Sequence, residues 1–417
     1  MPPARLAAAV VRQSAAFLPP VISLTRYRTL LARHDLRTLA IASIIGRLPI
    51  GVAGLAIMLM TQAASGSFAQ SGIATAGYVA GLAALAPLLG RYIDRNGPRR
   101  ALIASMMIYP SAMLALAAAT LMAAPYWAVL VTGLAAGASY PPITVCMRTL
   151  VKRLLTDEEQ IQTAFSLESV LIEMIFIVGP LMVALLVALI APLAAVVFAA
   201  LCAAIGTVMF LRAPALRNWR IEPRMQASLF GPLASPGFAG LLLVVLCYSA
   251  AFGLIEIAVT GFAGSRGQPA LAGVMLGLMS VGSVSGALVY GSRTWSRPLA
   301  QQFAAALALF AAGTALLAIV ENAFAFSFAC VLAGLAMSPP LIMQSMLVSK
   351  TTRAEHSTEA FTWASTSLLS GVSLGILGGG ALLEAHSVAT AFGAATTAAL
   401  TAAALATMLV RQRAGTP

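Results

Sequence analysis

Long apolar stretches, separated by short breaks of charge, proline and glycine, run along the whole chain. A helix that crosses a membrane needs about 20 mostly apolar residues, and the breaks divide the chain into twelve stretches of that kind. We predict spans at residues 38–63, 71–89, 101–123, 125–150, 160–189, 191–211, 238–263, 271–290, 299–320, 323–348, 357–383 and 388–410. The pattern therefore predicts an all-α membrane protein.

The longest internal break lies between the sixth and seventh spans, near the middle of the sequence. The predicted parts are a tail at 1–37, a six-helix bundle at 38–211, a central loop at 212–237, a second six-helix bundle at 238–410 and a tail at 411–417. The first residues resemble a signal peptide, but Arg12 interrupts their apolar run and no convincing cleavage site follows. We therefore expect an interfacial or disordered tail there.

The basic residues predict the orientation of the chain. When both termini are placed on one side, 23 of the 25 Lys and Arg residues fall on that side. Cytoplasmic loops carry an excess of Lys and Arg, so both termini are predicted to be cytoplasmic. Arg47 lies inside a span, and Arg266 lies on the other side. The preference for Arg over Lys and the abundance of Ala are typical of a GC-rich bacterial genome, so we expect a bacterial cytoplasmic (inner) membrane.

The composition limits the classes of binding partner that we expect for the protein. Hydrophobic residues make up 60% of the chain and charged residues only 9%, too few to cover a water-soluble surface. Mean hydropathy is +0.92. The formal net charge of +12 lies in short loop clusters, so we do not expect nucleic acid as a partner. We expect a monomer whose partners are a small-molecule substrate and membrane lipids.

No grouping of residues predicts catalysis, a metal site or a cofactor. The four cysteines lie singly in apolar segments, without a CxxC pair or a neighbouring His. No Ser/His/Asp set, HExxH sequence or phosphate-binding Gly loop is visible. We therefore expect neither an enzyme nor an ATP-driven pump, and a proton gradient is the expected energy source.

The two halves of the chain repeat each other at a shift of about 196 residues. The matched residues are Ala76/Ala272, Gly77/Gly273, Gly81/Gly277, Gly90/Gly286, Ala164/Ala360, Phe165/Phe361 and Gly179/Gly375. Spans four and ten share a Pro-Pro pair that begins at Pro141 and Pro339, and the only two lysines, Lys152 and Lys350, follow at equal distances. Two like-oriented halves related by an axis along the membrane normal are typical of transporters with parallel repeats.

The loop between spans two and three carries a motif, GRYIDRNGPRR, at residues 90–100. Gly90, Asp94, Arg95, Gly97 and Arg99 match G-x-x-x-D-R-x-G-(R/K)-(R/K), the loop motif of the major facilitator superfamily. Pro98 departs from it, since a basic residue is usual there. With twelve spans and an internal repeat, the chain resembles a member of this superfamily, which implies a fold of two pseudo-symmetric six-helix bundles.

The resemblance implies that this loop is a conformational latch. The Asp94 carboxylate would lie at the N-terminal end of span eleven, where free N–H groups and the helix dipole favour an anion. It would hold the cytoplasmic side closed in the outward-open state, while Gly90 allows close approach of span two to another helix. A solvated turn is the alternative. Tyr290 and Gly291 stand where Asp94 and Arg95 would repeat, so we expect a one-sided latch.

Two spans contain prolines that are expected to bend them. Pro49 lies in span one, and Gly179-Pro180 lies in span five. The Gly-Pro pair resembles the core of the family's antiporter motif, G-x-x-x-G-P-x-x-G-G. Ile175, Val183 and Ala184 depart from that motif. We therefore expect a bend in span five, and the incomplete motif gives little support for antiport.

Ionisable residues inside membrane spans are costly and are functional hypotheses by default. Arg47 and Glu173 lie at similar depths in spans one and five, which are neighbours in this superfamily, so we expect them to pair. The pair is either a structural clamp or a site at which substrate and proton exchange, and both alternatives stay open. Glu168 lies closer to the cytoplasm and is expected to meet Arg148 or Arg153.

The resemblance implies a central cavity lined by spans one, four, seven and ten. Candidate cavity residues besides Arg47 are Tyr140, Tyr248, Glu256 and Gln344, and Glu256 is either a proton site or an interfacial carboxylate. We expect a secondary active transporter that works by alternating access. Proton-coupled efflux of a drug-like or metabolite compound is the first hypothesis, and uptake or exchange of a small organic anion is the second.

Lipid or lysolipid translocation on the same fold is a further alternative. It needs a side opening, between spans five and eight or between spans two and eleven. Small residues permit helices to approach closely in membranes. Span eight carries such a stripe at Gly273, Gly277, Gly282 and Gly286, which permits tight closure at the first of these places.

Overall fold

The computed structural model describes residues 24–66, 68–217, 219, 221, 231–268 and 270–414. Over these residues the chain is helical and forms no strand. Twelve segments are long and apolar enough to cross a membrane, as the sequence predicts. The part of the predicted tail before residue 24, and most of the basic segment in the central loop, lie outside the described residues.

Each half is a bundle of long helices joined by short turns. The first half contains α2 (Leu24–Ala32), α3 (His34–Ser65), α4 (Phe68–Asn96), α5 (Pro98–Leu121), α6 (Tyr126–Ala138), α7 (Ile143–Leu154), α8 (Glu158–Leu189), α9 (Pro192–Arg212) and α10 (Pro214–Arg217). The second half contains η1 (Gly231–Ala234), α11 (Pro236–Ser265), α12 (Ala270–Ser292), α13 (Leu299–Ile319), α14 (Ala323–Leu335), α15 (Ser338–Thr351), η2 (Ala354–His356), α16 (Ser357–Ala385) and α17 (Val388–Ala414). The short helix α2 was expected to be part of an unstructured or interfacial tail.

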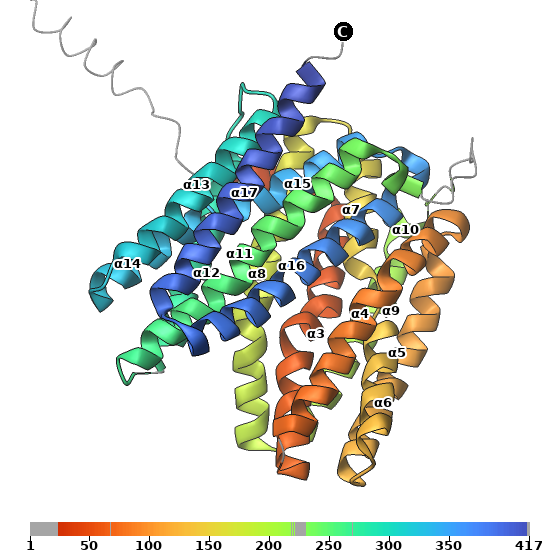
Figure 1. The fold of residues 1–417 in the computed structure, drawn as a ribbon. Coiled ribbons are helices and arrows are strands. Elements are labelled where there is room, and N and C mark those ends of the chain that lie inside the picture. The colour runs from red at the N-terminus through yellow and green to blue at the C-terminus, as the bar shows by residue number, and fades with distance from the viewer. Residues whose placement is uncertain are drawn as a thin grey trace, which may run out of the picture.

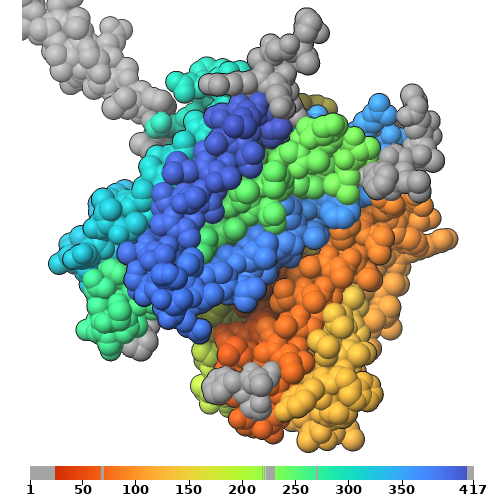
Figure 2. Space-filling view, viewed as in Figure 1, coloured from red at the N-terminus to blue at the C-terminus, as the bar shows by residue number. Residues whose placement is uncertain are grey.

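The two halves touch at one end and spread apart toward the other (Figure 1). We call the touching end the basic end, because it carries the α4–α5 turn and the Lys and Arg residues around it. One hydrophobic cluster joins both halves and includes Phe165 and Phe361. Two further clusters each lie within a single half. A recess separates the two lobes at the end opposite the basic end (Figure 2). The molecule is therefore closed at the basic end and open at the opposite end.

The fourth and tenth spans are each broken into two helices, which the sequence analysis did not expect. The first break separates α6 from α7, and the second separates α14 from α15. Proline lacks an N–H group and disfavours a helical conformation in the residue before it. The repeated Pro-Pro pairs, beginning at Pro141 and Pro339, therefore place a helix start at equivalent depths in the two halves. The single prolines Pro49 and Pro180 lie within continuous helices, so the expected bends there stay predictions.

Glycines allow the long helices of each half to cross closely. A Cβ at Gly179 would lie 2.7 Å from the backbone of Gly51, where α8 crosses α3. In the second half, a Cβ at Gly375 would overlap the carbonyl of Ala250, where α16 crosses α11. The predicted repeat of Gly179 and Gly375 thus marks equivalent crossings.

The contacts correct the repeat for spans two and eight. Gly81 packs on the carbonyl of Leu134, and Gly282 packs in the same way on Val331. Gly81 therefore corresponds to Gly282 and not to Gly277, a shift of 201 instead of 196 residues. The glycine matches in Gly-rich sequence were in the wrong register. The same contacts show that Gly282 faces α14 in its own half, so the glycine stripe on α12 does not serve closure against α8.

Candidate gating and substrate site

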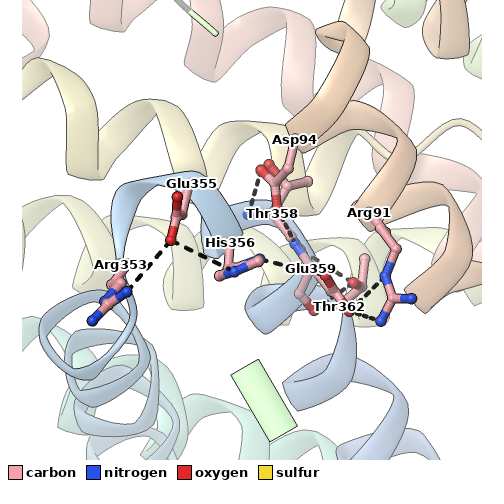
Figure 3. A network of polar contacts seen from close by, with 8 residues as sticks. All are labelled: Arg91, Asp94, Arg353, Glu355, His356, Thr358, Glu359 and Thr362. Carbon is pink, nitrogen blue, oxygen red and sulfur yellow. Dashed lines mark hydrogen bonds and ion pairs between the residues drawn. The ribbon is translucent and has the colours of Figure 1, made fainter. Parts of the chain in front are cut away.

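The Asp94 carboxylate lies against the start of α16 (Figure 3). Its Oδ1 accepts a hydrogen bond from the backbone N–H of Thr358 at 2.9 Å, and its Oδ2 accepts one from Glu359 at 2.8 Å. The first N–H groups of a helix have no partner within the helix, and the dipole favours an anion there. Asp94 comes from the first half and α16 from the second, so this contact holds the halves together, as the resemblance implies.

An ion pair between the two halves lies beside this contact. Arg91 donates from Nε and Nη2 to Oε1 of Glu359, at 3.0 and 2.6 Å. The Glu359 carboxylate is buried, and His356 Nδ1 lies 3.8 Å from its other oxygen. Neither Arg91 nor Glu359 was predicted from the sequence as a site residue. Arg91 occupies a variable position of the motif, and Glu359 shows no signal except its place in the first turn of span eleven.

The other motif residues have different roles. A Cβ at Gly90 would overlap the hydroxyl of Thr362, so glycine allows α4 to cross α16. Gly97 has φ of +78°, which glycine adopts readily, and it separates α4 from α5. Arg95 and Arg99 are exposed.

The end of α12 in the second half is also held against the first half, by uncharged hydrogen bonds. The expectation of a one-sided latch is therefore wrong. By the corrected register, Gly291 corresponds to Gly90, and its Cβ would overlap Ser166 of α8. The Gln162 side chain donates to the carbonyls of Tyr290 and Arg293, the latter at 2.9 Å. Thr163 donates to the Gly291 carbonyl at 3.1 Å. Here side chains of α8 bind the carbonyl groups at the end of α12.

The counterpart of Asp94 in this register is Trp295. Its indole N–H donates to the Tyr290 carbonyl at 3.1 Å, within its own half. The polar contact across the halves is supplied by α8 instead. Tyr27 of α2 adds a further contact, because its hydroxyl donates to the Leu288 carbonyl at 3.3 Å. Burial raises the pKa of Tyr27 to about 12, so this hydroxyl keeps its proton at neutral pH.

The only two lysines of the chain both reach across to the other half. Lys152 donates to the carbonyl of Thr352 at 2.6 Å, at the end of α15. Lys350 lies 2.7 Å from the Glu158 carboxylate, in the first turn of α8. The two lysines of the predicted repeat thus each form a polar contact with the other half at the basic end.

Arg47 pairs with Glu168, which corrects the expected pairing with Glu173. Its Nη1 lies 3.2 Å from Glu168 Oε1, and Nη2 donates to the Thr144 carbonyl at 3.3 Å. Glu168 also accepts from Arg148 Nε at 2.9 Å, one of the two partners that the sequence predicts. Five residues turn a helix by roughly 140° at about 3.6 residues per turn, so Glu168 and Glu173 face different neighbours.

The resulting cluster holds two arginines and one carboxylate. Arg47 is 1% exposed and Glu168 is 4% exposed, and Arg148 is only partly buried. A buried charge without a partner is strongly unfavourable. Two guanidinium groups beside one carboxylate leave the cluster with one excess positive charge, which an anion can neutralise.

Glu173 lies at the contact between the halves. It accepts a hydrogen bond of 2.7 Å from Ser283 of α12, and Ser283 lies 2.6 Å from Ser338. Ser338 is the first residue of α15, where the tenth span resumes after its break. A carboxylate of the first half is thus connected through two hydroxyls to a helix start in the second.

The remaining candidate residues lie apart from this contact. Tyr140, in the break of the fourth span, donates to the Gly46 carbonyl at 3.0 Å. Tyr248 and Gln344 are buried and hydrogen-bonded to each other within the second half. Glu256 is exposed. Substrate contact by these four residues stays a prediction.

We expect Asp94→Asn to favour conformations that are open at the basic end. Asparagine keeps an acceptor oxygen but loses the charge, and charge-assisted hydrogen bonds are roughly twice as strong as neutral ones. A loss of about 1.4 kcal/mol changes the ratio of two conformations tenfold. The measurement is modification of Lys152 by a small amine-reactive reagent, read by peptide mass spectrometry. Arg95→Gln is the control, because it removes an exposed neighbouring charge. Equal modification in wild type and Asp94→Asn would contradict the latch.

We expect Gln162→Glu to weaken the contact of the second half more than Gln162→Leu does. An ionised glutamate is an acceptor only, and it would face the carbonyl oxygens of Tyr290 and Arg293. Leucine removes the two hydrogen bonds without adding repulsion. The measurement is modification of Lys350, whose partner Glu158 begins the same helix. A Gln162→Glu protein that behaves like wild type would show that this contact does not hold the halves together.

Several solved transporter structures share this architecture. A bacterial homologue of the iron transporter ferroportin in an outward-facing state has a TM-score of 0.75 at 13% identity, covering 90% of this chain and 99% of that one. The human organic anion transporter MFSD10 has a TM-score of 0.69 at 16% identity, covering 93% and 100%. A variant of the Escherichia coli fucose:proton symporter FucP has a TM-score of 0.68 at 13% identity, covering 89% and 98%. Identities this low show the shared fold alone.

No curated protein matches the sequence. The family profile described as Major Facilitator Superfamily matches residues 39–300, more than half of the chain. This match agrees with the twelve spans and with the fold of the solved transporters. The chain is therefore a membrane transporter and not an enzyme, and it belongs to the Major Facilitator Superfamily.

Proposed function

We propose that this protein is a secondary active transporter that carries a small organic anion across a bacterial inner membrane by alternating access. The observation that carries the proposal is the Arg47–Glu168–Arg148 cluster, which holds one carboxylate for two guanidinium groups. A carboxylate or similar anion would balance the charge. Planar guanidinium groups match the geometry of a carboxylate.

Arg148 is the residue through which we expect the substrate to reach this cluster. It is more exposed than Arg47 and Glu168, with 15% of its side chain accessible. The next residue, Thr149, has its hydroxyl 3.2 Å from the Thr358 hydroxyl of the other half, so Arg148 lies near the interface at which the two halves separate. An anion that binds Arg148 would compete with Glu168 for the same guanidinium. Substrate binding and rearrangement of the cluster would then be coupled.

Glu173 is our candidate for the carried proton. Its carboxylate takes part in a contact between α8 and α12, which the movement of the halves must break. Protonation would replace a charge-assisted hydrogen bond by a weaker neutral one. A proton on Glu173 would therefore favour separation of the halves at this depth.

Proton-coupled efflux of a drug-like or metabolite compound is the second candidate. The observation in its favour is Glu256, an exposed carboxylate on α11 that could attract a cation. Its charge lies on the opposite half from the arginine cluster. Translocation of a lipid is less favoured, because α4 and α16, and likewise α8 and α12, are in tight contact at the basic end. Both termini are proposed to be cytoplasmic, on the strength of the basic loops.

We expect organic anions to raise the melting temperature of the detergent-purified protein, and Arg148→Gln to abolish the effect. A ligand at about ten times its Kd adds about 1.4 kcal/mol of stability. The screen would compare aromatic carboxylates, short dicarboxylates, lipophilic cations, sugars and lysolipids. Arg95→Gln, which changes an exposed arginine, should keep the wild-type response. Stabilisation by cations or lysolipids that survives Arg148→Gln would refute an anion site at this cluster.

We expect Glu173→Gln to abolish proton-driven transport of an anion found in that screen, while thermal stabilisation by the anion remains. Glutamine still accepts the hydrogen bond from Ser283 but cannot carry a proton. The measurement is uptake into proteoliposomes with and without an imposed pH gradient. Glu256→Gln is the matched control, since it neutralises a carboxylate in the other half. Near-normal gradient-driven uptake by Glu173→Gln would exclude this residue as the coupling site.

A further inference from the structure

A narrow pocket lies beside the Arg47–Glu168 pair, within the first half of the chain. Four elements surround it, namely α2, the beginning of α3, the end of α7 and the beginning of α8. Most of its lining is aliphatic. The lining residues are Leu30, Leu31, Leu36, Ala40, Ser43, Arg47, Met147, Val151, Ala164, Leu167, Glu168 and Leu171. Among the residues that the structure describes, none from the second half lines the pocket.

Two polar atoms of the lining residues are buried without a hydrogen-bond partner in the described part of the chain. These are Nε of Arg47 and Oε2 of Glu168. A buried polar group that lacks a partner costs about 1–3 kcal/mol. One is a donor and the other is an acceptor, so a single water molecule can satisfy both. Buried water needs two to four polar partners, and the hydroxyl of Ser43, also in the lining, offers a third.

The polar groups of the lining lie at its inner end, and aliphatic residues lie nearer the basic end. Ala40, Ser43 and Arg47 are spaced three and four residues apart, so they share one face of α3. Ser43 lies about one turn nearer the basic end than Arg47. Leu30 and Leu31 of α2 form the rim.

We propose that this pocket is a permanent water site that hydrates the Arg47–Glu168 pair, whichever way the two halves are open. Halves of such transporters move largely as rigid bodies, and a pocket built within one half keeps its lining during that movement. The proposal concerns hydration of the protein and does not depend on which compound is transported.

A consequence follows for the two carboxylates of α8. Glu173 lies at the interface and is released when the halves separate, whereas the pocket beside Glu168 is lined by the first half alone. The charged groups that face Glu168 are Arg47 from α3 and Arg148 from α7, and α2 contributes leucines to the lining. Water in the pocket would therefore solvate this ion cluster from the first half alone, whichever way the two halves are open.

The experiment is hydroxyl-radical footprinting of the purified full-length protein, with methionine oxidation read by mass spectrometry. Met147 lines the pocket and is 9% exposed, and Met113, in an apolar cluster of the same half, is 0% exposed and serves as the dry reference. We expect Met147 to be oxidised well above Met113. Ala40→Leu fills the pocket and should lower Met147 oxidation to the level of Met113. Leu31→Ala widens the rim and should raise it, which keeps the test valid if Ala40→Leu fails to fold.

The permanence of the site is tested in the Asp94→Asn protein, in which the basic end is expected to open. Met147 oxidation that is equal in this variant and in wild type supports a site built within one half. Loss of Met147 oxidation in Asp94→Asn would overturn its permanence. Protection of Met147 in wild type, equal to that of Met113, would overturn the water site. A lipid that co-purifies with wild type and is lost from Ala40→Leu, with Met147 protected, would make the occupant an acyl chain and also overturn it.

Discussion

The closure of the basic end depends on one constraint, which is that the first N–H groups of α16 need an acceptor where they meet the other half. Asp94 supplies two oxygens for them from α4, and glycine at position 90 lets the two helices come close enough. Arg91 then neutralises the Glu359 carboxylate that this approach buries. When the halves separate, water can replace Asp94 at the helix start. The contact is therefore strong enough to hold one conformation and weak enough to be exchanged.

The corresponding crossing of the second half has the opposite arrangement of hydrogen-bond donors and acceptors. Gly291 provides the close crossing, but α8 contributes side-chain donors and the end of α12 contributes carbonyl acceptors. Neither an amide nor a carbonyl titrates, whereas the Asp94 contact relies on a carboxylate. The pseudo-symmetric crossings therefore differ in their response to charge. Protonation or substitution of Asp94 weakens one crossing and leaves the other, so the halves can loosen on one side before they part.

The sequence predicted what the membrane demands and missed what depends on rotation about a helix. Twelve spans follow from length and hydropathy, and Asp94 stood out through its motif. Depth pointed to Glu173 as the partner of Arg47, but the angular position on α8 selects Glu168. The register of the repeat failed in span eight, since glycine matches are frequent there and only the packing of Gly282 fixes it. The Pro-Pro pairs were visible in the sequence, but the helix breaks beside them were not predicted.

The two carboxylates of α8 have different surroundings, which fit the different roles proposed for them. A charge carried across the membrane must reach each side in turn, which requires a place at the moving interface, and Glu173 has one. A charge that only sets affinity can stay within one rigid half, and Glu168 lies there between two arginines. If both carboxylates lay at the interface, each movement would have to rearrange the arginine pair in a medium that solvates charge poorly. On the proposed mechanism, Glu168 rearranges when an anion binds Arg148, and Glu173 changes its surroundings when the halves move.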